Sequence, residues 1–193
     1  MAVVADPCRA EASLTNLTTE RLRIEPLRSA HAGLVLSSLQ DPAIYTYLPT
    51  DPPTAESLQR SYDFWEGGRS PDGEERWLNW VAFLGDSMTP VGTFQATLPT
   101  REAGSIAYVV FPAFWRQGYA REMAARVITH LFQTYDNPSL FAEIDTRNLG
   151  SIRLVESLGL KRIATTHGAD FFKGASSDEY KYSVTRQDWL ARP

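Results

Sequence analysis

The stretch from Ser105 to Tyr135 reads SIAYVVFPAFWRQGYAREMAARVITHLFQTY and carries the clearest structural signal in the chain. Residues 106–111 have few polar side chains and precede Pro112, whose missing N–H cannot continue a β-ladder, so we expect a central strand that ends there. In the second half, apolar residues recur at alternating steps of three and four. This spacing predicts a helix with one continuous apolar face, made by Ala120, Met123, Ala124, Val127, Ile128, Leu131, Phe132 and Tyr135.

The turn between this strand and this helix has the chemistry of an anion site. Gly118, with the small Ala120 close behind it, lets the backbone approach a ligand. The first turn of the helix directs free N–H groups and its positive dipole end outward, which suits a phosphate or pyrophosphate. Arg116 and Arg121 flank the turn. The alternative is that Gly118 only closes a tight turn and both arginines are solvated; the turn alone does not decide.

The same turn resembles the acetyl-CoA-binding segment of the GNAT acyltransferases, whose pattern is Gln or Arg, two residues, Gly, one residue, then Gly or Ala. Gly118 and Ala120 match this pattern, whereas Trp115 stands at the Gln/Arg position. An aromatic residue followed by a basic one is similar to the RimJ/RimL branch, which acetylates ribosomal-protein N-termini. Three further segments resemble that branch in the expected order, at residues 17–24, 148–160 and 178–189.

This resemblance covers about residues 17 to 190 and implies an α/β fold. The fold would be a mixed, mostly antiparallel sheet of six or seven strands, with helices on both faces and a cleft between strands four and five. Those two strands correspond to residues 106–111 and 140–146. The resemblance also implies that acetyl-CoA is the cosubstrate and that a primary amine attacks the thioester directly in a ternary complex.

The cofactor-binding residues that the resemblance implies fall into three groups. The backbone of the central strand would hold the pantetheine and the developing oxyanion, and the turn would hold the pyrophosphate. Asn148 would hydrogen-bond the cofactor arm near the sulfur, and Ser151 would protonate the leaving thiolate. The full set is Tyr108, Val109, Val110, Arg116, Gln117, Gly118, Tyr119, Ala120, Arg121, Asn148 and Ser151. The alternative for Asn148 and Ser151 is that they only cap a helix.

A general base must take a proton from the ammonium form of the substrate. Glu143 and Asp145 alternate onto one face of the strand expected at residues 140–146, and Glu143 is the first candidate, ahead of His167 and Asp170. A carboxylate in such a position is also a common salt-bridge partner, so this alternative stays open.

The acceptor is expected near the first two helices, because in GNAT relatives that region lines the acceptor pocket. The candidates for substrate contact there are Tyr45, Tyr47, Tyr62 and Trp65, unless these aromatics only fill the core. The segment at residues 167–179, expected to be a loop, would contribute further contacts.

The remaining pattern predicts one domain at residues 17–193, preceded by a leader without regular structure at residues 1–16. Alternation predicts a strand at residues 21–27, and aromatic and β-branched residues predict a hairpin of strands at residues 77–84 and 91–98. Two closing strands are expected at residues 160–166 and 180–185. Capping and turn residues predict further helices at residues 29–39, 54–65 and 148–158.

Composition bounds the function classes. The 193 residues are 43% hydrophobic and 22% charged, as in ordinary globular proteins. No stretch approaches the roughly 20 apolar residues of a membrane span, and no signal peptide is evident, so we expect neither a membrane partner nor export. The lone Cys8 agrees with a cytoplasmic location. A net charge of -4 argues against nucleic-acid binding. With one cysteine and three dispersed histidines, we expect no metal.

The function that follows is transfer of an acetyl group from acetyl-CoA to a primary amine, either a protein N-terminus or a small molecule. The alternative is a non-catalytic acyl-CoA-binding or sensor protein on the same fold, because a fold and a ligand site do not guarantee chemistry. The sequence leaves the acceptor open, and a monomer and a homodimer are both compatible with it.

Overall fold

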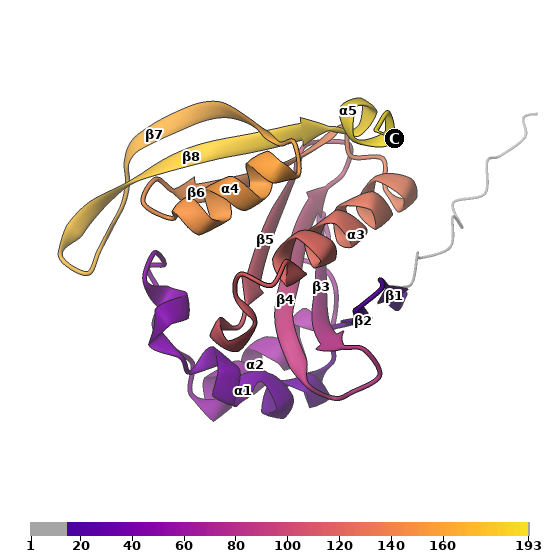
Figure 1. Ribbon diagram of the computed structural model, residues 1–193, viewed down its shortest axis with the longest axis vertical. Coiled ribbons are helices and arrows are strands. Elements are labelled where there is room, and N and C mark those ends of the chain that lie inside the picture. The colour runs from indigo at the N-terminus through magenta and orange to yellow at the C-terminus, as the bar shows by residue number, and fades with distance from the viewer. Residues whose placement is uncertain (1–14, 193) are drawn as a thin grey trace, which may run out of the picture.

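The computed structural model describes residues 15–192, and all strands in this part of the chain form one sheet with the order β1-β2-β3-β4-β5-β6-β8-β7 (Figure 1). Most of the leader predicted at residues 1–16, with Cys8, lies outside the described residues. The strands are β1 (Leu17–Thr18), β2 (Leu22–Pro26), β3 (Glu75–Leu84), β4 (Pro90–Pro99), β5 (Gly104–Val110), β6 (Ser139–Asp145), β7 (Lys161–Phe172) and β8 (Ala175–Thr185).

The helices are α1 (Ala32–Leu39), α2 (Ala55–Trp65), α3 (Tyr119–Thr134), α4 (Leu149–Ser157) and α5 (Arg186–Leu190), and the 3-10 turns are η1 (Ser29–His31), η2 (Pro42–Tyr45) and η3 (Pro112–Phe114). Within residues 15–192, none of these helices is long and apolar enough to cross a membrane.

The sheet is mixed and mostly antiparallel, as predicted, because β5 and β6 pair in parallel and the other neighbouring strands pair antiparallel. It has eight strands rather than six or seven. The additional strand is the two-residue β1, in which Leu17 lies opposite Ile24. A strand of this length is too short to produce a periodic signal in the sequence.

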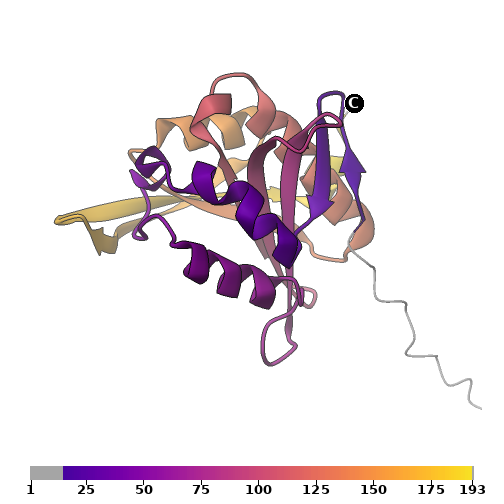
Figure 2. The ribbon, with the colours of Figure 1, turned by 90° about the horizontal axis from the view of Figure 1, so that it is seen from below.

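Helices cover both faces of the sheet, which confirms the predicted layering (Figure 2). Trp80 of β3 packs with α3 and α4, whereas its neighbour Val81 packs with α1 and α2. This division follows from the period of two along a strand, which sends successive side chains to opposite faces. The sheet is therefore the wall between two apolar clusters.

The predicted apolar face of α3 is buried against the sheet. Met123, Ala124, Val127, Ile128, Leu131 and Phe132 are its buried residues. Each of the larger side chains contributes about 1.5–3 kcal/mol by leaving water, so burial of this stripe fixes how the helix lies on β4 and β5. The N-terminus of α3 consequently lies beside the end of β5, where the turn connects the two elements.

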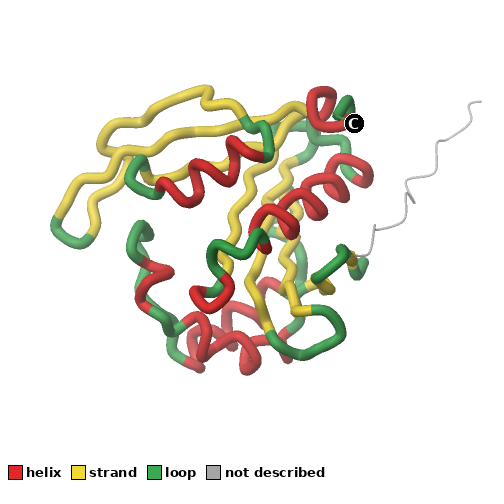
Figure 3. Tube along the Cα trace, in the orientation of Figure 1, coloured by secondary structure: helices red, strands yellow, loops and turns green. Residues whose placement is uncertain are grey.

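The loop expected at residues 167–179 is instead a β-hairpin, formed by β7 and β8 and turned at Lys173 and Gly174 (Figure 3). The prediction was wrong because β7 is exposed along almost its whole length and so has no alternating apolar pattern. Register shifts interrupt its pairing with β8. Near the hairpin tip, the Lys173 ammonium donates a hydrogen bond to the Tyr45 carbonyl, which brings the hairpin against η2.

Candidate functional site

The centre of the site is the place where β5 and β6 separate. The two strands pair only at Gly104 with Leu140 and at Ser105 with Phe141. A Cβ at Gly104 would lie 2.4 Å from a methyl carbon of Leu98 and 2.9 Å from one of Leu140, so glycine permits this close pairing. Beyond it the strands diverge, which confirms the predicted cleft, and a cavity of about 620 Å³ opens between them.

In this cavity, only every second residue of β5 has backbone groups that do not pair with β4. The Phe111 amide donates to the Val91 carbonyl at 2.9 Å, and Val109 lies opposite Thr93 in the same register. Because hydrogen-bonded pairs alternate along an antiparallel ladder, the backbone groups of Val109 belong to the pairing with β4, whereas those of Tyr108 and Val110 point toward β6. This corrects the expectation for Val109: the residue lines the cavity, but its amide and carbonyl belong to the pairing with β4 and are not free for a ligand.

The turn before α3 has the left-handed geometry that its glycine permits. Gly118 has a φ of 86° and is the N-cap of α3, and Arg116 also adopts a positive φ, of 61°. Of the residues predicted to bind pyrophosphate, those that line the cavity are Arg116, Gly118, Tyr119, Ala120 and Arg121. Gln117 does not line it. Its side-chain amide donates to the Ala113 carbonyl at 3.0 Å instead.

Arg21 stabilises this turn through its side-chain contacts, a role that the sequence did not predict. Its guanidinium donates to the Gln117 carbonyl at 3.0 Å, pairs with Glu122 at 2.6 Å and lies 4.3 Å from the centre of the Tyr119 ring. Burial alone would raise the pKa of Glu122, but hydrogen bonds from Thr19 and Arg21 leave it below its usual value. No local pattern identifies Arg21, because its partners lie far along the chain.

Asn148 and Ser151 lie together at the N-terminus of α4, and both line the cavity. The Asn148 side-chain oxygen accepts a hydrogen bond from the Ser151 amide at 3.1 Å, which is an N-cap contact. Asn148 therefore caps α4, which was the alternative role given for this residue. The Ser151 carbonyl accepts a hydrogen bond from the Tyr108 hydroxyl at 3.4 Å across the cleft. Tyr108 is partly buried, and desolvation raises the pKa of its phenol to about 12.

An acidic face completes the cavity on the side of the sheet that α1 and α2 cover. It is formed by Glu143 and Asp145 of β6, Asp170 of β7 and Glu179 of β8. The shared face of Glu143 and Asp145 was predicted from strand alternation. Glu179 was missed because it fell in the segment predicted as a loop.

The four carboxylates differ in their partners. Glu143 pairs with the Lys181 ammonium at 3.1 Å. Asp145 pairs with Arg147 at 2.5 Å and accepts from the Ser177 hydroxyl at 2.6 Å. The hydrogen bonds from Arg147 hold the pKa of Asp145 at about 2, against the opposing effect of burial. His167, by contrast, does not line the cavity and instead pairs with Asp178 at 2.9 Å.

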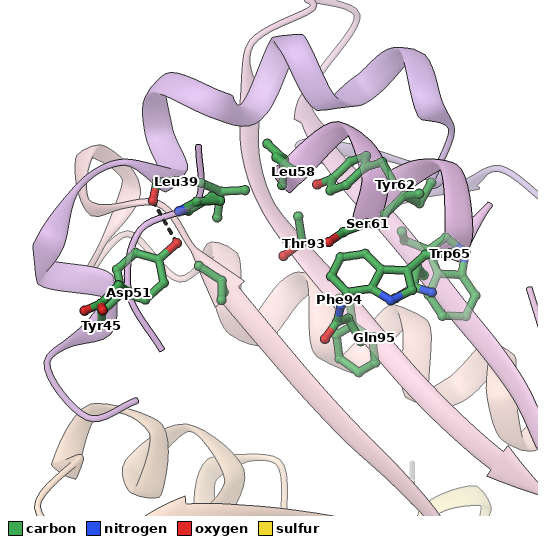
Figure 4. Close-up of a pocket in the computed structure, with 15 residues that line it drawn as sticks. Leu39, Tyr45, Asp51, Leu58, Ser61, Tyr62, Trp65, Thr93, Phe94 and Gln95 are labelled. Atoms are coloured by element: carbon green, nitrogen blue, oxygen red, sulfur yellow. Dashed lines mark hydrogen bonds between the residues drawn. The ribbon is translucent and has the colours of Figure 1, made fainter. Parts of the chain in front are cut away.

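A second, smaller cavity of about 220 Å³ lies between α2 and the sheet (Figure 4). Three of the four aromatics proposed for the acceptor line it, namely Tyr45, Tyr62 and Trp65, whereas Tyr47 lines the large cavity. The Tyr45 hydroxyl donates to the Leu39 carbonyl at 2.8 Å (Figure 4). Val109 lines both cavities, so this residue of β5 is the wall that they share.

Among residues 15–192, His, Cys, Asp and Glu side chains do not form any group of three or more that would hold a metal ion.

The sequence pattern of the GNAT acetyltransferase domain matches residues 21–161, which is more than half of the chain. The protein therefore belongs to the GNAT acetyltransferase domain family. Among curated relatives, the FsC-acetyl coenzyme A-N(2)-transacetylase of Aspergillus fumigatus is 27% identical over 187 residues, covering 90% of this chain and 77% of the relative. The uncharacterized N-acetyltransferase YoaA of Bacillus subtilis is 22% identical over 172 residues, covering 88% and 96%.

Two solved structures illustrate the shared fold. The ribosomal-protein-S5-alanine acetyltransferase from Vibrio fischeri superposes with a TM-score of 0.78 at 16% identity, covering 93% of this chain and 100% of that chain. The spermidine N-acetyltransferase from Vibrio cholerae, in complex with CoA and spermine, gives a TM-score of 0.76 at 15% identity, covering 89% and 99%. At these identities the likeness concerns the fold alone.

Proposed function

We propose that this protein transfers an acetyl group from acetyl-CoA to a primary amine, which attacks the thioester directly while both substrates are bound. One observation carries the proposal: a single cavity joins the left-handed turn at Gly118, the free edge of β5 and the acidic face of β6 and β8. Family membership supports the acetyl donor, and the curated relatives named as N-acetyltransferases support transfer to nitrogen.

In this proposal the donor lies along the splayed strands. Backbone N–H groups at Gly118, Tyr119, Ala120 and Arg121 hold the pyrophosphate, where the dipole of α3 favours negative charge. Arg116 supplements them with its guanidinium, whereas Gln117 serves the turn through contacts of its own rather than through the ligand.

The thioester would lie between Tyr108 and α4. The outward-pointing N–H groups of Tyr108 and Val110 and the Tyr108 carbonyl are available to the pantetheine, and the N–H groups stabilise the negative charge that develops on the acetyl oxygen; the Val110 carbonyl already accepts from the Trp115 indole. Asn148 binds the cofactor arm with the part of its amide that the helix cap does not use. Ser151 donates its hydroxyl proton to the departing thiolate, and Glu143 is the base that the sequence suggests, although Lys181 pairs with it.

The acceptor is a protein N-terminus or a small amine. The RimJ/RimL type, which the Trp115-Arg116 pair suggests, would favour a protein N-terminus, and the acceptor would approach through Tyr47 and the cavity at Tyr45, Tyr62 and Trp65. We further propose a cytoplasmic location, in which acetyl-CoA is available, with a monomer or a homodimer as the working form.

A thiol-release assay tests the proposal. Purified protein is mixed with acetyl-CoA and one of two pools, either peptides with N-terminal Ala, Ser or Thr, or small amines that include polyamines and aminoglycosides. Release with one pool identifies the acceptor class. Tight binding of acetyl-CoA in titration calorimetry without release from any amine would contradict the proposal.

That last outcome would support the second candidate, a non-catalytic acyl-CoA-binding protein. One observation favours it: the Trp115 indole donates to the Val110 carbonyl at 2.5 Å and so occupies one of the backbone acceptors that point into the cleft. Absence of acetyl-CoA binding would remove both candidates.

A further inference from the structure

The β8 strand brings a fourth carboxylate to the cleft. Glu179 lies directly opposite Asp145 in the antiparallel pairing of β8 with β6. Residues that are opposite each other in such a pair project to the same face, and both side chains line the large cavity. Glu179 therefore faces the place where β5 and β6 separate, on the side of the sheet that α1 and α2 cover and on which η2 and α2 carry aromatic candidates for acceptor contact.

Glu179 differs from the neighbouring carboxylates in having no committed partner. Glu143 is paired with Lys181 at 3.1 Å, and Asp145 is held by Arg147 and Ser177. Within the described part of the chain, the Glu179 carboxylate makes no hydrogen bond and no ion pair. A base in hydrogen-bonding reach of a substrate needs a lone pair that the protein does not already use.

The surroundings of Glu179 also raise its affinity for a proton. Its pKa lies above the usual carboxyl value because burial disfavours the charged form, and because Glu143, Asp170 and Asp145 add repulsion. Glu179 is half-buried, whereas Asp170 is exposed. The groups facing this position from the elements packed against it are the carboxylates of Glu143, Asp145 and Asp170, the cations of Arg147 and Lys181, and the phenol of Tyr47.

We propose that Glu179 is the catalytic base, which takes a proton from the ammonium group of the acceptor. This inference rests on the proposed acetyl transfer. The carboxylate of Glu179 accepts one proton and leaves a neutral amine, whose lone pair attacks the thioester carbonyl carbon. The carbon–sulfur bond breaks, and the second proton lost by nitrogen ends on the thiolate by way of the Ser151 hydroxyl. The products are the amide and CoA thiol, and Glu179 returns its proton to water.

The geometry also gives Glu143 a different role. The ion pair holds the Lys181 ammonium beside Glu143 of β6. There the ammonium neutralises one negative charge of the acidic face. Glu143 thereby acts as a positioning residue that leaves Glu179 as the free acceptor of a proton.

The test compares the pH profiles of kcat/KM for the amine in wild type, Glu179→Gln and Glu179→Asp. In wild type, kcat/KM rises through the pKa of Glu179 and reaches a plateau at neutral pH, because the enzyme removes the proton itself. In Glu179→Gln, kcat/KM is lower on the order of a hundredfold at neutral pH. It then rises tenfold per pH unit toward the pKa of the amine, because only the neutral amine reacts. Glu179→Asp restores part of the plateau.

Two controls separate structure from chemistry. Glu102→Gln removes an exposed carboxylate from the turn between β4 and β5 and should leave the profile unchanged. Calorimetric titration should give the same acetyl-CoA affinity for Glu179→Gln as for wild type, which shows that the fold is intact.

The outcomes distinguish the two proposals. If wild type turns over an amine and Glu179→Gln keeps the wild-type profile, the assignment of Glu179 is overturned and acetyl transfer stands. If wild type releases no thiol with any amine at any pH, acetyl transfer fails, and the role of Glu179 fails with it.

Discussion

The indole N–H of Trp115 donates a hydrogen bond to the carbonyl oxygen of Val110 at 2.5 Å. Val110 is the last residue of β5, and its carbonyl points away from β4 into the cleft. Trp115 stands where the family pattern has Gln or Arg, so the substitution exchanges a flexible polar side chain for a rigid ring that ties the turn to the strand. The turn at Gly118 is thereby held in place before any ligand binds.

Trp115→Phe tests this tie. Phenylalanine keeps an aromatic ring, although a smaller one than the indole, but lacks the N–H, so the Val110 carbonyl loses its partner. We expect the free energy of unfolding to fall by about 1 kcal/mol, the usual net contribution of one hydrogen bond. Urea unfolding of the two proteins measures the difference. Equal stabilities would mean that water replaces the indole without cost.

Gly118→Ala tests the left-handed turn. An L-residue at a φ of 86° carries a strain of about 1–2 kcal/mol, and the new Cβ would lie 3.3 Å from the Arg21 guanidinium. We expect a loss of stability of that size. We also expect about tenfold weaker acetyl-CoA binding, equivalent to about 1.4 kcal/mol, because the backbone N–H groups shift. Calorimetric titration measures the second effect.

Gly33→Ala is the matched control for that substitution. Gly33 lies within α1, and a Cβ there would meet no atom within 4 Å. Alanine should stabilise the helix by roughly 0.5–1 kcal/mol and leave acetyl-CoA binding unchanged. The interpretation of Gly118 fails if both variants behave alike.

The fold was predictable where burial leaves a period in the sequence. The stripe on α3 and the alternation in β4 are strong because each element has one buried face, whereas β3 is buried on both faces and was recognised from its aromatic and β-branched residues. The β7 strand has no such face, since both its sides are exposed; its first half was predicted as a strand, but its second half, from residue 167, was taken for a loop. What holds β7 in the sheet is backbone pairing with β8, which leaves no trace in side-chain pattern.

The residues of the candidate site also fall into two groups, those that a local sequence motif identifies and those that it does not. The turn at Gly118 and the N-cap at Asn148 are local, so short motifs identified them. Arg21 and Glu179 reach the site through pairing and packing with residues that are distant in sequence, as Glu179 does opposite Asp145. Only the register of the sheet brings such residues together, and a single sequence does not contain it.

Ser151→Ala tests the proton donor. The substitution removes the hydroxyl but keeps the Ser151 amide that the Asn148 side chain caps, so the start of α4 should be preserved. We expect kcat to fall on the order of a hundredfold with little change in acetyl-CoA affinity, because proton transfer to the thiolate is lost. Ser157→Ala, at the far end of the same helix, is the control. Full activity in Ser151→Ala would remove the proposed role.

Asp145 makes the stability of the protein depend on pH in acid. Its folded pKa is lowered from 3.8 to about 2, chiefly by hydrogen bonds from Arg147. A lowered pKa contributes stability that is fully present above pH 3.8 and is lost as the pH falls through about 2. Since the Arg147 side chain is 45% exposed, we expect a contribution of about 1–2 kcal/mol.

Asp145→Asn should therefore be less stable than wild type at neutral pH and lose less stability between about pH 4 and pH 2. Urea unfolding at several pH values, without any ligand, gives the slope of the unfolding free energy against pH for each protein. Asp86→Asn in the exposed turn after β3 removes a carboxylate that lies far from Arg147 and should keep the wild-type slope. Parallel slopes for Asp145→Asn and wild type would show that the hydrogen bonds from Arg147 and Ser177 do not lower the pKa of Asp145 in the folded chain, and would contradict this prediction.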